Sequence, residues 1–124
     1  MNVHALDHIV LNVADVEASL SWYIDLVGLE PVRVDEWRRG EVFFPSVRVN
    51  DSTILDLLAV PRHAANMDHL CLVVDRADVD TIERDGRFTI VDGPDHRYGA
   101  RGDGWSIYVK DPDDNTVEFR SYDG

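Results

Sequence analysis

The sequence predicts an α+β fold built from two copies of a β-α-β-β-β module. The segment at 6–13 returns at 67–74, with an Asp-His pair in the same place. Two later segments also return: 46–51 as 106–111, and 54–57 as 116–119. Nearly equal offsets along the chain indicate an internal duplication, in which neither unit closes a core alone. A chance similarity between strands is the alternative.

The first module is predicted to open with a strand and a helix. Residues 6–13 are β-branched and aliphatic, which is typical of a strand. Asp15 suits a helix N-cap, apolar residues follow at helical spacing, and Gly28 stands where a left-handed residue ends a helix. Turn signals then separate three predicted strands, at 31–37, 42–50 and 53–60.

The second module repeats this order after a short linker at 61–66. Its first strand is predicted at 67–74, and its helix is predicted to be capped by Asp78 and closed by Gly86. We therefore expect a single domain over residues 1–124, made of modules at about 1–62 and 63–124.

The two halves differ most at 92–104, where glycines and a proline interrupt the chain. We interpret this segment as a lid or substrate loop, because a long loop inside a compact domain is usually functional; a plain hairpin is the alternative. Tyr98 and Arg101 in this segment become candidate substrate-binding residues. Trp37 is a further candidate for lining a substrate pocket, although burial of apolar area is its simpler role.

The charge balance limits the expected partners. The chain has 24 acidic and 12 basic side chains, a formal net charge of -12. Such a surface repels phosphate backbones and anionic lipids, and no apolar run reaches the roughly 18 residues of a membrane helix. We expect neither a nucleic acid nor a membrane as partner. Because Cys71 is the only cysteine and no secretion signal is evident, the cytoplasm is the expected compartment.

Two histidines and two carboxylates occupy matching places in the two modules. Side chains alternate between the faces of a strand, so His8 and His69 lie on the faces turned away from the helices. If the modules pair with approximate twofold symmetry, His8 becomes equivalent to His69, and Asp56 to Glu118. The symmetry predicts that two imidazoles and two carboxylates converge.

Asp56 and Glu118 each stand in an apolar strand, where an unpaired charge is costly. A divalent cation held by neutral imidazoles and ionised carboxylates compensates such charges and leaves positions open for substrate or water. The alternative is four unrelated residues, with the carboxylates paired to arginines such as Arg48 and Arg120.

Four stretches carry a family resemblance. They read LDHIVLNVADVEASLSWY at 6–23, DLVGL at 25–29, MDHL at 67–70 and SIYVKDPDDNTVEF at 106–119. With these the chain resembles the vicinal oxygen chelate superfamily, which includes glyoxalase I, fosfomycin resistance proteins, extradiol dioxygenases and bleomycin resistance proteins. The resemblance implies paired βαβββ modules whose mixed sheets form a cup around a metal site, the glyoxalase-like fold.

The resemblance also implies residue roles. His8, His69 and Glu118 match the metal-binding His, His and Glu of the family, and Asp56 matches the place of a fourth, glutamate ligand that can act as a base. Asp56 is one methylene shorter, so it binds the metal directly, binds through water or accepts a proton. Asp56 and Glu118 are the candidate catalytic residues, and the implied cofactor is a divalent Mn, Fe, Ni, Co or Zn ion.

Ser106 and Tyr108 match the Ser-x-Tyr that contacts phosphonate oxygens in fosfomycin resistance proteins, so they join the candidate substrate-binding residues. Other parts of that site are missing, which argues against fosfomycin itself. Small members of the family are typically dimers whose site draws on both subunits. A homodimer is therefore the expected assembly.

The leading hypothesis is a divalent-metal-dependent enzyme acting on a small molecule with neighbouring oxygens, by glyoxalase-like lyase, isomerase or transferase chemistry. One alternative is an extradiol-type dioxygenase. Another is a noncatalytic ligand-sequestering protein of the bleomycin-resistance type, whose members generally lack the metal residues. A sensor or accessory subunit that holds metal without turnover is the third.

Overall fold

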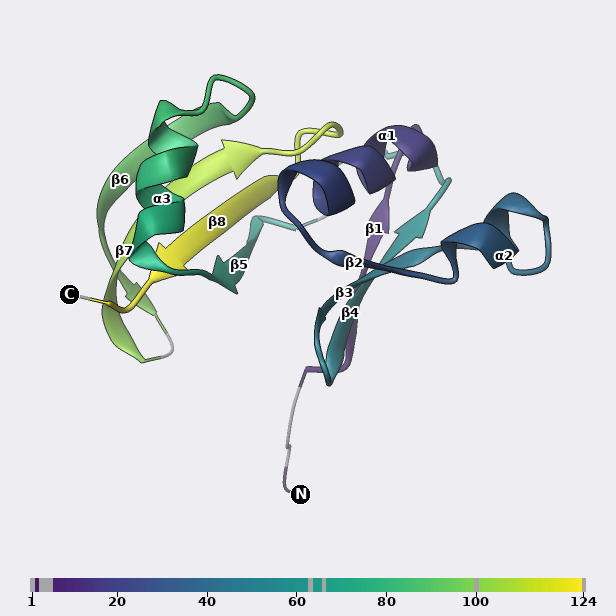
Figure 1. Ribbon diagram of the computed structural model, residues 1–124, viewed down its shortest axis with the longest axis horizontal. Helices are drawn as coiled ribbons and strands as arrows, with labels where there is room; N and C mark the ends of the chain where they lie inside the picture. Colours follow the sequence, from purple (N-terminus) through teal and green to yellow (C-terminus); the bar gives the residue numbers. More distant parts are fainter. Residues whose placement is uncertain (1, 3–5, 63, 66, 100, 124) are drawn as a thin grey trace. The chain divides into compact units, whose positions relative to one another are not determined.

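The computed structural model describes residues 2, 6–62, 64–65, 67–99 and 101–123. The chain separates into two compact units, Met1–Asn66 and Met67–Gly124. Each unit has its own four-stranded mixed sheet with helices (Figure 1). The α+β class and the repeated strand order predicted from the sequence are confirmed.

The sheet of the first unit has the order β1-β4-β3-β2. β1 and β4 run parallel, and the other neighbours are antiparallel. The strands are β1 (His8–Asn12), β2 (Glu30–Val32), β3 (Ser46–Asn50) and β4 (Thr53–Leu58). Leu11, Leu55 and Leu57 are buried on one face of this sheet, and His8 lies exposed on the other face.

The helix of the first unit begins where the sequence predicts. Asp15 is the N-cap of α1 (Val16–Leu20), and its side chain accepts a hydrogen bond from a first-turn backbone N–H at 3.1 Å. The helix continues as a π-helix, η1 (Ser21–Leu26), which the sequence pattern does not predict. Tyr23 in this turn is fully buried, and Gly28 follows with a φ of 90°, as its left-handed role requires.

The strand predicted at 31–37 is wrong over most of its length. β2 ends at Val32, and Val34–Arg38 forms a short helix, α2. Arg33 between them has a φ of 58° and a ψ of 27°, a left-handed conformation that ends the extended backbone. Two acidic residues in the first turn and a basic residue in the last turn then favour the helix through its dipole.

The sheet of the second unit has the order β5-β8-β7-β6. β5 and β8 run parallel and the other neighbours are antiparallel, as in the first unit. The elements are β5 (His69–Val73), α3 (Arg76–Arg84), β6 (Thr89–Gly99), β7 (Gly102–Lys110) and β8 (Thr116–Ser121). Helix α3 packs on β7 and β8, and Val79, Ile107 and Phe119 are buried.

Helix α3 starts one turn before the predicted start. Asp75 is its N-cap, and Asp78, predicted as the cap, is the third helical residue. The Asp75 backbone N–H donates to Oδ2 of Asp78 at 3.3 Å, as in a capping box. The helix ends at Arg84, so Gly86 lies beyond it. An aspartate does cap this helix, as predicted. The N-cap is Asp75, however, and Asp78 is its partner in the capping box.

The segment at 92–104, predicted as a loop, is instead the outer part of a β-hairpin. β6 and β7 pair as far as Gly99 and Gly102, and the second of two register shifts, between Asp92 and Asp95, accommodates Gly93 and Pro94. Glycine and proline usually indicate a loop, but here they lie in an irregular part of the β6–β7 ladder, and strand pairing continues beyond them. The plain hairpin, the alternative to a lid, is the observed structure.

The hairpin is expected to resist limited proteolysis. Arg97 lies within the β6–β7 ladder, whereas Arg62 lies in the irregular segment between β4 and β5. Proteases cut exposed chain without ladder bonds first. Trypsin should therefore cut after Arg62 before it cuts after Arg97, and mass spectrometry of the early fragments would show the order. Initial cleavage at Arg97 would contradict a stable hairpin.

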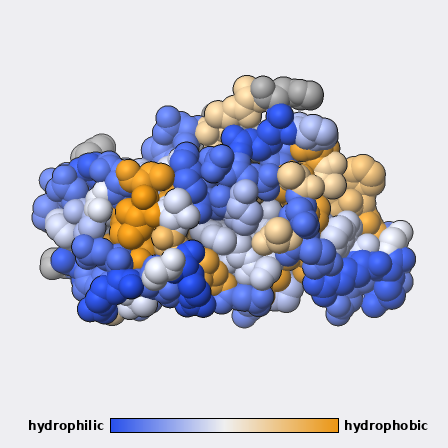
Figure 2. Space-filling view, turned by 90° about the horizontal axis from the view of Figure 1, so that it is seen from above, coloured by the Kyte–Doolittle hydropathy of each residue, from blue (hydrophilic) through white to orange (hydrophobic). Residues whose placement is uncertain are grey.

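Polar residues dominate the surface. Figure 2 shows one face that is largely hydrophilic and is broken by apolar patches. The exposed apolar side chains include Val10 on β1 and Val73 on β5. None of the described helices is long and apolar enough to cross a membrane.

Candidate functional site

Each unit carries one histidine and one carboxylate in the same relative place. On β1 and β4, His8 lies opposite Ile54 and Val10 opposite Asp56; on β5 and β8, His69 lies opposite Thr116 and Cys71 opposite Glu118. In both units the carboxylate is two positions farther along the neighbouring strand, on the face of the histidine. The strand register thus makes His8 equivalent to His69 and Asp56 equivalent to Glu118.

A second carboxylate orients each imidazole ring. Nδ1 of His8 lies 2.7 Å from Oδ2 of Asp7, and Nδ1 of His69 lies 2.6 Å from Oδ1 of Asp68. The hydrogen bond with Asp7, and to a smaller extent the charge of Asp56, raise the pKa of His8 above its ordinary value. A carboxylate on Nδ1 fixes the tautomer and the ring orientation, so Nε2 is the nitrogen left for another group.

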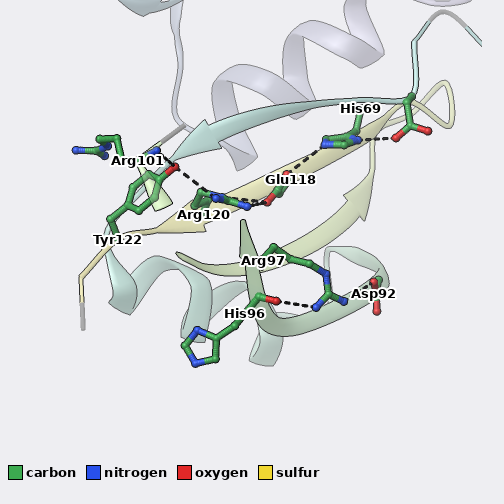
Figure 3. A network of polar contacts seen from close by, with 9 residues as sticks. His69, Asp92, His96, Arg97, Arg101, Glu118, Arg120 and Tyr122 are labelled. Carbon is green, nitrogen blue, oxygen red and sulfur yellow. Dashed lines mark hydrogen bonds and ion pairs between the residues drawn. The ribbon is translucent and has the colours of Figure 1, made fainter. Parts of the chain in front are cut away.

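In the second unit, Glu118 lies between His69 and Arg120 (Figure 3). Oε2 of Glu118 is 3.2 Å from Nε2 of His69. Oε1 accepts hydrogen bonds from Nε and Nη2 of Arg120 at 3.1 and 2.9 Å. Glu118 and Arg120 are each only 3% exposed. The arginine pairing that the sequence left open as an alternative is therefore present at Glu118.

The surroundings of Glu118 favour its ionised form. Burial raises the pKa of this carboxyl, but the Ser106 hydroxyl and the Arg120 guanidinium outweigh burial, so the pKa lies below its ordinary value. Desolvation and the charge of Glu118 raise the pKa of the Cys71 thiol to about 12. At neutral pH this cluster therefore contains a carboxylate and a protonated thiol.

Arg120 has further contacts beyond Glu118. Its Nη1 donates to the Tyr122 hydroxyl at 3.4 Å, and the same hydroxyl accepts from the Arg101 backbone N–H at 3.1 Å. A Cβ at Gly104 would lie 3.0 Å from Cγ of Arg120, so the glycine leaves room for the arginine stem. Contacts thus run from the end of the hairpin to Glu118 (Figure 3).

Two predicted substrate-binding residues lie on β7 beside this cluster. Tyr108 is opposite Glu118, and its ring is edge-on to His69 with ring centroids 5.6 Å apart. Ser106 is opposite Arg120 and fully buried. Its hydroxyl is near enough to lower the pKa of Glu118, but among the described residues it makes no hydrogen bond of ordinary geometry. Both side chains share the face of Glu118.

In the first unit, Asp56 is held by Ser46. The Ser46 hydroxyl donates to Oδ1 of Asp56 at 2.6 Å, and both residues are buried. Ser46 lies opposite Asp56 as Tyr108 lies opposite Glu118. The ladder therefore makes Ser46 equivalent to Tyr108, whereas the sequence comparison of 46–51 with 106–111 matched it to Ser106. The predicted alignment of β3 with β7 is wrong by two positions.

Replacing Ser46 should destabilise the protein. Ser46→Ala leaves Oδ1 of Asp56 buried without its short hydrogen bond, which costs about 1–3 kcal/mol. Chemical denaturation would measure this loss. Ser52→Ala is the control, because Ser52 is exposed at the β3–β4 turn and such a change stays within about 0.5 kcal/mol. Equal stabilities of the two variants would contradict a structural role for the Ser46 hydroxyl.

The other predicted substrate-binding residues take different positions. Trp37 is half-buried on α2 in the first unit, not on a strand. The guanidinium of Arg101 lies 4.2 Å from the centroid of the Tyr122 ring, at the end of the network opposite to His69 (Figure 3). Tyr98 is part of the β6–β7 ladder, and its side chain lies outside the described residues.

The donor atoms of the second unit fit part of a metal site. Metal–nitrogen and metal–oxygen bonds of about 2.0–2.2 Å place adjacent ligands of one ion roughly 3 Å apart. Nε2 of His69 and Oε2 of Glu118, at 3.2 Å, match this separation. Within the described part of the chain, no group of three or more His, Cys, Asp or Glu side chains could hold a metal. Nε2 of His69 and Oε2 of Glu118 are thus two donors at ligand spacing, and the described residues add no third.

Several residues of these clusters were missed in the sequence. Asp7 and Asp68 had a signal, because the Asp-His dipeptide repeats. Arg120, in contrast, is one of the arginines that the sequence offered as partners of the carboxylates, and a residue two positions from Glu118 on a strand shares its face. Tyr122 and Gly104 contact Arg120 because of the way the strands are paired, and the sequence contains no signal for these contacts.

Known proteins identify the family. The Glyoxalase/Bleomycin resistance protein/Dioxygenase superfamily matches residues 5–119. The chain belongs to this superfamily. The resemblance carried by the stretches at 6–23, 25–29, 67–70 and 106–119 is confirmed.

Two relatives match nearly the whole chain. Virulence protein STM3117 of Salmonella typhimurium is 26% identical over 125 residues, which cover 98% of this chain and 87% of that protein. Glyoxalase domain-containing protein RDO1 of Mycosarcoma maydis is 31% identical over 127 residues, which cover 98% of this chain and 70% of that protein.

Solved structures share the fold. The structure of STM3117 has a TM-score of 0.77 at 24% identity and covers 99% of this chain and 100% of its own. Lactoylglutathione lyase from Agrobacterium tumefaciens has a TM-score of 0.64 at 21% identity, with 98% and 96% covered. TnmS3, an antibiotic binding protein from Streptomyces sp. CB03234, has a TM-score of 0.70 at 20% identity, with 98% of each chain covered. An enzyme and a binding protein thus have the same fold.

Proposed function

We propose that this protein is a divalent-metal-dependent enzyme that acts on a small molecule with two neighbouring oxygens. The arrangement of His69 carries the proposal: its Nε2 is 3.2 Å from Oε2 of Glu118, while Asp68 holds its Nδ1. Histidines that bind metals almost always donate the second ring N–H to a carboxylate, a backbone carbonyl or a water. Asp7 and His8 repeat this arrangement in the other unit.

His8, His69 and Glu118 are the proposed metal ligands. Each unit offers one histidine and one carboxylate, so a complete site would draw on both units, from one chain or from two copies. Imidazole and carboxylate donors suit Mn(II), Fe(II), Co(II), Ni(II) and Zn(II). Asp56 would be either the fourth ligand or the group that takes a proton from the substrate.

The bound ion would stabilise an oxyanion on the substrate and lower the pKa of a bound hydroxyl. Asp56 is suited to move a proton, because it is buried and Ser46 fixes its carboxylate. The Tyr108 hydroxyl, on the face of Glu118, would orient a polar group of the substrate. Lyase, isomerase or transferase chemistry follows from these roles, and the likeness to lactoylglutathione lyase supports it.

Thermal unfolding tests the metal. Chelator-stripped protein would be melted alone and with each of the five metals in turn. Binding to the native state at 100 times the dissociation constant adds about 2.7 kcal/mol. Metal-loaded protein would then be assayed with small α-hydroxycarbonyl compounds, and with catechols, for which oxygen uptake would indicate an extradiol-type dioxygenase. No stabilisation by any metal would contradict the proposal.

A noncatalytic binding protein is the second candidate. The buried Glu118–Arg120 ion pair supports it, because the arginine compensates the carboxylate without any metal. The likeness to the antibiotic binding protein TnmS3 agrees with it. Under this alternative, a ligand would bind chelator-stripped and metal-loaded protein equally well.

The homodimer that the family resemblance implies is the proposed assembly, and exposed valines lie beside both histidines. Val10 shares the face of His8 and is 44% exposed, and Val73 shares the face of His69 and is 57% exposed. Single exposed valines are normal on a folded surface, so these two side chains agree with an interface without requiring one. We infer a homodimer with a site shared between subunits, and the single cysteine, Cys71, supports the cytoplasm as its compartment. A monomeric mass in sedimentation equilibrium with metal present would contradict the dimer.

A further inference from the structure

We propose that Arg120 is a positioning residue that occupies Oε1 of Glu118 and leaves Oε2 as the single oxygen this carboxylate can offer to a metal. The inference rests on the proposed function. It adds which oxygen of Glu118 faces the metal. Arg120 itself binds neither metal nor substrate in this role. It acts through Glu118.

The hydrogen bonds of the pair are one-sided. Nε and Nη2 of Arg120 reach Oε1 of Glu118 at 3.1 and 2.9 Å, while Oε2 is 3.2 Å from Nε2 of His69. An arginine that pairs fork-to-fork places one nitrogen on each carboxylate oxygen. Here both nitrogens use one oxygen. The two oxygens of Glu118 therefore face different partners, and the one facing His69 is suited to share an ion with it.

The packing around the guanidinium favours this geometry. Both members of the pair are buried, so water does not compete for Oε1. The Tyr122 hydroxyl accepts from Nη1, and the missing side chain of Gly104 makes room for the arginine stem. Tyr122 thus holds the guanidinium from a second side, which restricts the rotation of the Glu118 carboxylate.

In the first unit, no arginine takes the place that Arg120 has beside Glu118. The residue two positions after Asp56 is Leu58, in the place that Arg120 has relative to Glu118. Asp56 is held instead by one hydroxyl, from Ser46. Because the duplicated strands place the two carboxylates equivalently, the arginine is specific to Glu118 rather than a general feature of the repeat.

The consequence concerns coordination number. A carboxylate that binds through one oxygen takes one position at the ion, whereas one that binds through both oxygens takes two. By reserving Oε1, Arg120 would keep one more position open. A substrate with two neighbouring oxygens needs two open positions. Arg120 would therefore help to set the substrate class that the site accepts.

Infrared spectroscopy tests this mode of binding. Difference spectra of Zn(II)-loaded minus chelator-stripped protein report the separation of the antisymmetric and symmetric carboxylate stretches, which is wide for one-oxygen and narrow for two-oxygen binding. Glu118→Gln assigns the bands. We expect a wide separation in the wild type and a narrow one in Arg120→Gln, with Zn(II) affinity reduced about 10- to 100-fold.

Two further variants complete the test. Arg87→Gln is the matched control, because the exposed Arg87 pairs with Asp85 outside this cluster; wild-type affinity and spectrum are expected. Arg120→Lys keeps the charge but not the planar fork, so it should fold without restoring the wide separation, and it carries the test if Arg120→Gln does not fold.

The outcomes separate the two proposals. Unchanged affinity and separation in Arg120→Gln, or their full recovery in Arg120→Lys, would overturn the positioning role while the metal site stands. Failure of the wild type to bind Zn(II) or any other metal would overturn the metal site and this inference with it.

Discussion

His69→Ala is expected to abolish the stabilisation of this protein by divalent metal. The substitution removes Nε2, the donor that lies 3.2 Å from Oε2 of Glu118. A site left with fewer ligands loses most of its affinity, so the gain of about 2.7 kcal/mol at 100 times the wild-type dissociation constant should vanish. Thermal unfolding with and without metal measures the difference. The variant should melt close to the chelator-stripped wild type, because the His69 side chain is 37% exposed.

His96→Ala is the control for this experiment. His96 is also an exposed strand histidine, but it lies on β6, where its ring is edge-on to Trp105. Its removal should leave the metal-dependent stabilisation intact. Asp68→Asn should give an intermediate result, with affinity reduced about 10- to 100-fold, because the ring of His69 loses its charged partner. Full metal stabilisation in His69→Ala would refute the assignment of His69 as a ligand.

The strands that carry the histidines could be predicted because their patterns are simple. Each is a short aliphatic run that opens with an Asp-His pair, and the return of the segment 6–13 at 67–74 supports both assignments. The segment at 31–37 has a similar composition but contains Arg33, whose left-handed backbone ends the strand. Nothing in the composition of that segment marks an arginine for a positive φ. In that segment the packing of the unit, rather than the strand propensity of the residues, determines the secondary structure.

The site was predictable in its residue types but not in its contacts. The sequence placed His8, His69, Asp56 and Glu118 in equivalent positions, and the strand register agrees. The sequence could not show that Arg120 pairs with Glu118. An arginine two positions away on the same strand shares the face of the carboxylate, but its side chain can either contact the carboxylate or extend beyond it. That choice depends on the room left by Gly104, which lies on the neighbouring strand β7.

Gly93→Ala is expected to destabilise the protein by about 2–4 kcal/mol. Gly93 has a φ of 84°, which L side chains rarely adopt, and a Cβ there would lie 2.6 Å from the backbone oxygen of Ser106. The oxygen belongs to a paired strand, so β6 must move away from β7. For a chain of this size the melting temperature should fall by roughly 10 °C, which calorimetry would show.

Gly86→Ala separates this steric effect from a general cost of replacing glycine. Gly86 has no positive φ, and a Cβ there would meet nothing within 4 Å, so the same substitution should be neutral or stabilising by up to about 1 kcal/mol. Because Ser106 flanks Glu118, Gly93→Ala should also weaken metal binding, whereas Gly86→Ala should not. Loss of stability with unchanged metal affinity in Gly93→Ala would show that β7 keeps its place and that β6 alone yields.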